Sequence, residues 1–325
     1  MSRSSLLTRR TLICTGLAFG LLVTLPLQAE TQLRIGYQKS STLISLLKAQ
    51  DSLEKALRPQ GIAISWHEFT SGQPLLEALN LGNIDLSADV ADTVPVFAQA
   101  AGAKLTYFAQ EAPSPAAQAI IVQQDSPLHT LADLKGKTVA VTKAAGSHYL
   151  LIAALAKAGL KFSDIQPAYL TPADGRAAFE NHKVDAWVTW EPFLSGAQRQ
   201  LATRTLVDGQ GLASYQRYYL TGTQFAQNNP KVLQAVFDEL VKTGQWLRAH
   251  PKEGAKILGP LWGNLDPAIV EQANARRSYA VRAVQRESLE EQQRIADAFY
   301  AAGLLPRKID ARDVSIWKPE NTDAR

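Results

Sequence analysis

Two stretches of this chain repeat one pattern, in which a short apolar strand is followed by a turn of small residues with one lysine and then by a helix. The first stretch spans residues 33–47 and the second spans residues 138–155. A turn that opens a helix leaves backbone N–H groups unpaired at the positive end of the helix dipole. Each turn is therefore a candidate anion site. We predict two half-sites that face each other across a cleft.

The two turns carry the groups that we expect to bind an anion. They are Gln38, Lys39, Ser40 and Ser41 in the first turn, and Lys143, Gly146, Ser147 and His148 in the second. Each turn follows the carboxyl end of its predicted strand, where open α/β sheets bind ligands. A turn lysine is also an ordinary solvent-exposed residue. The prediction therefore depends more on backbone N–H groups and hydroxyls than on the ammonium groups.

Strand and helix patterns alternate after the first turn. Strands are predicted at 62–66, 84–86 and 105–108, and helices at 74–81 and 93–101. Such alternation predicts a parallel or mixed sheet covered by helices. The proline-containing segment 111–115 interrupts this first set of elements.

A second set of elements opens at 119–122 and parallels the first. Lys39 precedes Asp85 by 46 residues, and Lys143 precedes Asp185 by 42. The parallel predicts two α/β lobes, which we assign to residues 30–118 with 220–325 and to residues 119–219. The crossover segments are expected near 115–120 and 218–224. Three amphipathic helices are expected within 228–302, as a cover for the first lobe.

The stretch 186–192 contains two tryptophans. Alternation along a strand places Trp187 and Trp190 on opposite faces. We expect Trp187 in the core, whereas Trp190 ends the strand beside the cleft, where it forms either a pocket wall or part of the core. Glu191 follows it as a further candidate contact. An aromatic wall suits the apolar part of a ligand whose head is an anion.

Three aspartates, Asp85, Asp89 and Asp92, stand close together but lack the glycine-centred loop of a calcium site. Asp92 precedes Thr93 and is expected to be the N-cap of the next helix. The Asp92–Thr93 turn should supply further N–H groups to the anion. The histidines lack zinc spacing, and no G-x-S-x-G motif is present. We predict no metal, no cofactor and no catalytic residue.

Residues 1–29 have the features of a cleavable export signal. Three arginines precede an apolar stretch at 12–23, and Leu27-Gln28-Ala29 offers a cleavage site before Glu30. The pair Arg9–Arg10 leaves general secretion and twin-arginine export open. Cleavage would remove the single cysteine and lower the formal net charge from +4 to +1. The mature chain then has no basic excess for nucleic acid or anionic lipid, and no disulfide.

Further motifs are those of a known family. They are residues 34–39, 75–80, 84–86, 97–103, 133–137, 158–160, 169–174 and 184–192. With these motifs the mature chain resembles the periplasmic aliphatic-sulfonate-binding proteins of ABC importers, within a group that also includes nitrate, taurine and thiamine-precursor binders. The resemblance implies an α/β, two-lobe type II periplasmic-binding-protein fold with two crossover segments.

The resemblance also implies a function, which is capture of an aliphatic sulfonate in the periplasm for sulfur acquisition. A monomer would deliver the ligand to an ABC permease with its ATPase. Residues 88–95 and 144–146 depart from the family motifs near the expected site. A sulfate ester, taurine or nitrate is therefore an alternative ligand. An enzyme that acts on a small anion is the alternative outside transport, and the absence of a recognisable nucleophile motif disfavours it.

Overall fold

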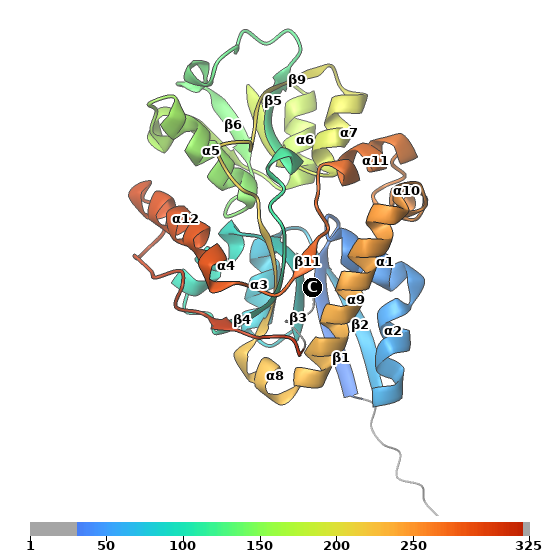
Figure 1. The fold of residues 1–325 in the computed structure, drawn as a ribbon. Helices are drawn as coiled ribbons and strands as arrows, with labels where there is room; N and C mark the ends of the chain where they lie inside the picture. Colours follow the sequence, from blue (N-terminus) through green and yellow to red (C-terminus); the bar gives the residue numbers. More distant parts are fainter. Residues whose placement is uncertain (1–30, 321–325) are drawn as a thin grey trace, which may run out of the picture. The chain divides into compact units, whose positions relative to one another are not determined.

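The computed structural model describes residues 31–320, which form two β-sheets with covering helices (Figure 1). The predicted export signal lies outside these residues. The first sheet has seven strands, which are β1 (Thr31–Gln38), β2 (Ile62–Phe69), β3 (Leu86–Ala91), β4 (Leu105–Glu111), β10 (Arg217–Gly222), β11 (Val281–Arg282) and β12 (Ser315–Ile316). The second has five strands, which are β5 (Gln118–Gln123), β6 (Thr138–Val141), β7 (Gln166–Tyr169), β8 (Ala186–Trp190) and β9 (Thr203–Asp208).

Both sheets are mixed. The first has the order β11-β4-β10-β3-β1-β2, with β12 also paired to β4, and the second has the order β7-β6-β8-β5-β9. β1 pairs in parallel with β2 and β3, and β6 pairs in parallel with β7 and β8. β10 and β5 run antiparallel to their neighbours. The predicted α/β class with mixed sheets is confirmed.

Helices follow most of the strands. They are α1 (Thr42–Gln50), α2 (Ser52–Leu57), α3 (Gly72–Asn80), α4 (Thr93–Ala100), α5 (Gly146–Lys157), α6 (Pro172–Glu180), α7 (Phe193–Gln200), α8 (Thr223–Asn228), α9 (Pro230–Ala249), α10 (Pro251–Leu261), α11 (Pro267–Ala275) and α12 (Leu289–Ala301). The two predicted strand–turn–helix copies are confirmed as β1 followed by α1 and β6 followed by α5. None of the helices within residues 31–320 is long and apolar enough to cross a membrane.

The strand predicted at 84–86 was placed too early. β3 begins at Leu86, and all six of its residues are buried between β1 and β10. Asp85 precedes the strand and forms a two-pronged ion pair with Arg34, at 3.0 and 2.6 Å. The consequence is that Asp89 lies inside a central strand.

The chain passes between the sheets twice. The first crossover lies between β4 and β5 and the second between β9 and β10. The second crossover therefore ends before the predicted 218–224, because β10 pairs with β3 and β4 from Arg217 onward. The Ser114 N–H donates to the Ser214 carbonyl at 3.0 Å, so the two crossovers lie side by side. We propose that each sheet with its helices forms one lobe, hinged at these segments.

The C-terminal part forms four helices after α8, namely α9 to α12, whereas three were predicted. Prolines at the first positions of α10 and α11 set two of the boundaries. α9 packs on α1 and α2, whereas α11 packs on α7 and α12 on both α4 and α5. Phe299 of α12 is fully buried in the cluster that contains Leu150 of α5. These helices therefore contact elements of both sheets instead of covering the first alone.

The contact between the crossovers predicts a sensitive position at Gly209. Its N–H donates to the Pro115 carbonyl, and a Cβ built there would lie 2.4 Å from that oxygen and 2.9 Å from the Ala213 oxygen. We expect Gly209→Ala to lower the free energy of unfolding by about 2 kcal/mol or more, because backbone must move. Urea denaturation followed by tryptophan fluorescence measures this loss. Gly222→Ala, whose Cβ meets no atom within 4 Å, is the matched control, and equal losses would contradict the prediction.

Candidate functional site

A small cavity lies where strand ends and helix starts of both sheets converge. Its volume is about 10 Å³, which is room for about one water molecule. The lining residues are Gln38, Gly72, Ala91, Val94, Ala145, Gly146, Trp190, Tyr215 and Arg217. Three of the predicted site residues, Gln38, Gly146 and Trp190, are therefore brought together.

The turn before α5 presents unpaired N–H groups beside this cavity. Within residues 31–320, the backbone N–H groups of Gly146 and Ser147 have no hydrogen-bond partner, and α5 has no side-chain cap. The Ser147 hydroxyl is also buried without a partner. A Cβ at Gly146 would lie 2.7 Å from the Tyr215 ring and 2.9 Å from the Ala91 Cβ. Glycine therefore permits the close approach of the two sides.

The turn before α1 is bonded mainly to itself. The Gln38 N–H donates to the Ser41 Oγ at 3.1 Å, and the Ser41 N–H donates to the Gln38 carbonyl at 2.8 Å. The Gln38 Nε2 donates to the Asp89 carbonyl at 3.4 Å, which is long. Ser40 is buried and its carbonyl accepts from Arg277 at 3.0 Å, whereas Lys39 is exposed and does not line the cavity.

Asp92 is the N-cap of α4, as predicted, and it also fastens the return crossover. One carboxylate oxygen accepts from the N–H of Thr93 at 2.9 Å, and the other accepts from the N–H of Gln216 at 3.0 Å. Thr93 itself is fully buried. Burial raises the pKa of Asp92 from 3.8 to about 7, against the lowering effect of these two N–H groups. The carboxylate thus links the start of α4 to a crossover.

Lys143 and His148 lie away from the cavity lining. Lys143 is exposed, and its ammonium lies 5.9 Å from the centre of the Tyr169 ring. The His148 Nδ1 accepts from the Ala144 N–H at 3.2 Å, and its ring contacts that of Phe299. Burial, with a smaller effect of Lys143, lowers the pKa of His148 to about 3. A neutral His148 therefore holds the turn in shape.

The two tryptophans of β8 divide as predicted. Trp187 is 1% exposed in the core against Phe179, whereas Trp190 lines the cavity and meets Phe193 edge to face at 5.8 Å. The carboxylate of Glu191 accepts from Ser195 and from Arg276, which is 2.5 Å away. Burial raises the pKa of Glu191, and Arg276 opposes that shift. Glu191 therefore joins β8 to the segment after α11.

A buried ion network stands behind the cavity, and the sequence analysis missed it. Arg217 lines the cavity and pairs with the Asp89 carboxylate. Arg277 pairs with the same carboxylate at 3.0 Å and with Glu111 at 2.7 Å. The Arg217 Nη1 also donates to the Tyr215 hydroxyl at 2.9 Å. The available signal was a charged residue, Arg217, at the start of the otherwise uncharged strand β10.

Residues 31–320 contain no cluster of three or more histidine, cysteine or carboxylate side chains that could hold a metal ion. Asp85, Asp89 and Asp92 are instead held by Arg34, by two buried arginines and by backbone N–H groups respectively. The three aspartates therefore have separate structural partners.

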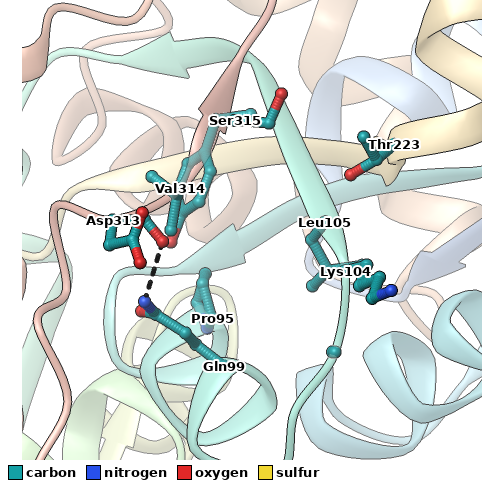
Figure 2. Close-up of a pocket in the computed structure, with 10 residues that line it drawn as sticks. Pro95, Gln99, Lys104, Leu105, Thr223, Asp313, Val314 and Ser315 are labelled. Carbon is teal, nitrogen blue, oxygen red and sulfur yellow. Dashed lines mark hydrogen bonds between the residues drawn. The ribbon is translucent and has the colours of Figure 1, made fainter.

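A larger cavity of about 290 Å³ lies elsewhere, between α4, β4 and the C-terminal segment around β12 (Figure 2). Its lining includes Pro95, Gln99, Lys104 and Thr223, and the Gln99 Nε2 donates across it to the Asp313 carbonyl at 3.1 Å. None of the predicted site residues lines it. None of the described helices of eight or more residues begins in its lining, so it lacks the N–H groups that the start of a longer helix would offer to an anion. Of these two cavities the small one is the better candidate, because residues of both paired turns line it.

The chain is similar to known proteins over most of its length. Residues 58–254 match the NMT1/THI5-like family. The chain is 42% identical over 293 residues to an Escherichia coli K12 protein that bears the name aliphatic sulfonates-binding protein, covering 90% of this chain and 91% of that protein.

Two solved structures are similar throughout. The alkanesulfonate-binding protein SsuA from Xanthomonas axonopodis pv. citri, bound to MOPS, has a TM-score of 0.83 at 39% identity, covering 88% of this chain and 98% of that one. The periplasmic aliphatic sulphonate binding protein SsuA from Escherichia coli has a TM-score of 0.80 at 42% identity, covering 90% and 94%. The predicted fold is confirmed.

The buried Asp92 predicts a pH-dependent stability. Its folded pKa of about 7 exceeds the unfolded value, so the stabilising contribution is full below about pH 4 and is lost as the pH rises to about 7. Relative to Asp92→Asn, the free energy of unfolding of the wild type should fall by up to about 4 kcal/mol over that window. Urea denaturation at a series of pH values measures the difference. A wild type that gained stability relative to Asp92→Asn as the pH rose would contradict the assignment.

Proposed function

This chain belongs to the NMT1/THI5-like family, among the aliphatic sulfonates-binding proteins, and on this premise we propose that it captures an aliphatic sulfonate in the periplasm. It then delivers the ligand to an ABC permease with its ATPase, for sulfur acquisition. The observation that carries the proposal is the cavity, where Gly146, at the start of α5 and with an unpaired N–H, lies with Gln38, Arg217 and Trp190.

The proposed site matches the two ends of an aliphatic sulfonate. A sulfonate is a permanent anion with three acceptor oxygens, so it requires converging donors rather than a proton-transfer partner. The N–H groups of Gly146 and Ser147, the Ser147 hydroxyl and the Gln38 amide supply such donors. Trp190 and Val94 supply an apolar wall for the carbon chain. Arg217 and Tyr215 also line the cavity, and we add them to the proposed contacts.

The other predicted site residues shape the two turns in this proposal. Ser41 and His148 hold the turns by hydrogen bonds. Ser40, Asp92, Thr93 and Glu191 are buried and tied to neighbouring segments. Lys39 and Lys143 are exposed, where they add a positive potential that attracts an approaching anion.

A cavity of about 10 Å³ is smaller than a sulfonate group, so ligand entry requires the two sides to separate. We propose that the lobes open about the paired crossovers and close again on the ligand. Ligand binding would shift the population toward the closed state, and the permease would recognise that state. The predicted signal at residues 1–29 would take the chain to the periplasm, where the family relatives act.

We propose no catalytic role. Ser147 has a buried hydroxyl, but that hydroxyl has no base within hydrogen-bond distance. The neighbouring His148 uses Nδ1 on the Ala144 backbone. The Ser195 hydroxyl donates to Glu191, whose carboxylate is paired with Arg276. None of these serines has the nucleophile–base arrangement of a hydrolase.

The ligand class can be tested by a binding screen. We expect alkanesulfonates to raise the melting temperature of the mature protein more than taurine, nitrate or methyl sulfate at equal concentration, because binding stabilises the folded state by mass action. The buffer must contain no sulfonate, which excludes MOPS. Mass spectrometry of the incubated ligands should find no product. A larger shift with nitrate, or any turnover, would contradict the proposal.

The placement of the ligand can be tested with two variants. Gln38→Ala should weaken every alkanesulfonate by on the order of tenfold, because a donor to the charged group is lost. Trp190→Ala should weaken butanesulfonate more than methanesulfonate, because only the longer chain loses apolar contact. Isothermal titration calorimetry measures both effects. Trp246→Ala, which removes a tryptophan of α9 stacked on His250, is the control. Equal losses at all chain lengths for Trp190→Ala would place the ligand elsewhere.

A further inference from the structure

The charges buried behind the cavity balance one another. Arg217 and Arg277 face Asp89 and Glu111, and all four side chains are at most 3% exposed. The Asp89 Oδ2 accepts from the Arg217 Nε and from the Arg277 Nη2, and the Glu111 Oε2 accepts from the same Arg277 nitrogen. Two positive and two negative charges therefore give this network no net charge.

The arginine that reaches the cavity is already compensated. Arg217 directs its Nε to the Asp89 carboxylate, its Nη2 to the Asp89 carbonyl at 2.9 Å and its Nη1 to the Tyr215 hydroxyl. Among the described residues, Arg276 is likewise paired with Glu191, and Lys39 and Lys143 are exposed. An anion in the cavity therefore meets N–H dipoles and a neutralised arginine, with no surplus buried cation.

Asp89 contacts two of the residues that line the cavity. Its Oδ1 is buried without a hydrogen-bond partner, and its carbonyl binds Gln38 and Arg217, which both line the cavity. N–H dipoles can hold one negative charge, but a second charge in a poorly solvated site would have no countercharge, because Asp89 and Glu111 already balance Arg217 and Arg277. This difference between one charge and two is the basis of the inference.

We propose that Asp89 is a specificity-determining residue, which admits monoanions of the R–SO₃⁻ class and rejects dianions such as sulfate and phosphate. Asp89 would act through Arg217, by cancelling the positive charge that a dianion requires. The inference rests on the proposed function, because it concerns the same anion site.

The wild-type protein provides a test that changes ligand charge without changing ligand shape. Methylphosphonate loses its second proton between about pH 6 and about pH 8.5, whereas methanesulfonate stays a monoanion. Calorimetry in bis-tris propane at constant ionic strength should show that phosphonate affinity falls about tenfold or more relative to sulfonate affinity. Asp92 also ionises in this pH range and repels a dianion more than a monoanion, so the same titration is repeated in Asp92→Asn, where the fall in the ratio should persist. A ratio that does not change with pH would overturn the proposal.

Variants then assign the effect to Asp89. In Asp89→Asn the amide oxygen can keep both arginine contacts, and the new NH₂ takes the place of the unpartnered Oδ1. The affinity for sulfate relative to methyl sulfate should rise about tenfold or more. Glu180→Gln, which neutralises an exposed carboxylate on α6, removes the same charge and should leave the ratio unchanged. An unchanged ratio in Asp89→Asn would overturn the assignment.

A second variant covers the case in which Asp89→Asn does not fold. Glu111→Gln removes a charge from the same network while an amide oxygen can still accept from Arg277 or Tyr219. The sulfate ratio should rise in this variant as well, and no rise would overturn the proposal. Tight methanesulfonate binding together with equally tight dianion binding would refute this inference alone. Failure of methanesulfonate to bind at all would refute the proposed function.

Discussion

The buried network of Arg217, Arg277, Asp89 and Glu111 is the constraint on which the rest of the site depends. Removing a charge from water costs several kcal/mol, and a buried ion is tolerated only when its partner is in place. The four side chains come from β3, β4, β10 and the segment after α11. Arg277 also binds the Ser40 carbonyl. The first turn, three central strands and the C-terminal segment must therefore assemble together.

This network determines how the anion site that we propose could attract its ligand. Because its carboxylates neutralise its guanidinium groups, attraction for an anion must come from dipoles, and the start of α5 supplies them. Gly146 allows those N–H groups to approach Tyr215 and Ala91 more closely than any other residue could. The site therefore depends on close packing rather than on excess positive charge.

The two crossovers are linked by hydrogen bonds, and we propose that the two lobes move relative to each other about them. Asp92 bonds to Gln216 in the return segment, and Ser114 bonds to Ser214 beside it. Across the molecule, Glu191 and Arg276 join β8 to the segment after α11. Ligand-binding loops come from the less stable part of a structure. We propose that opening retains the crossover bonds and breaks contacts around Gly146.

The sequence by itself determined the local elements, because each depends on residues a few positions apart. Apolar periodicity predicted both strand–turn–helix copies, the side chain of Asp92 predicted a helix start, and strand alternation predicted the burial of Trp187. The resemblance to a known family supplied the fold. Of the residues predicted for the site, Gln38, Gly146 and Trp190 line the small cavity, and they lie at the ends of predicted strands or the start of a predicted helix.

Only the tertiary structure decided which distant residues meet. Arg277 pairs with Asp89 across 188 positions of sequence and with Glu111 across 166. No local pattern records such a pair, because its stability comes from burial that exists only after the sheets and C-terminal helices have packed. For the same reason, Lys39 and Lys143 matched the expected pattern and yet lie in solvent. A turn specifies its backbone locally, whereas the surrounding fold decides which of its side chains is enclosed.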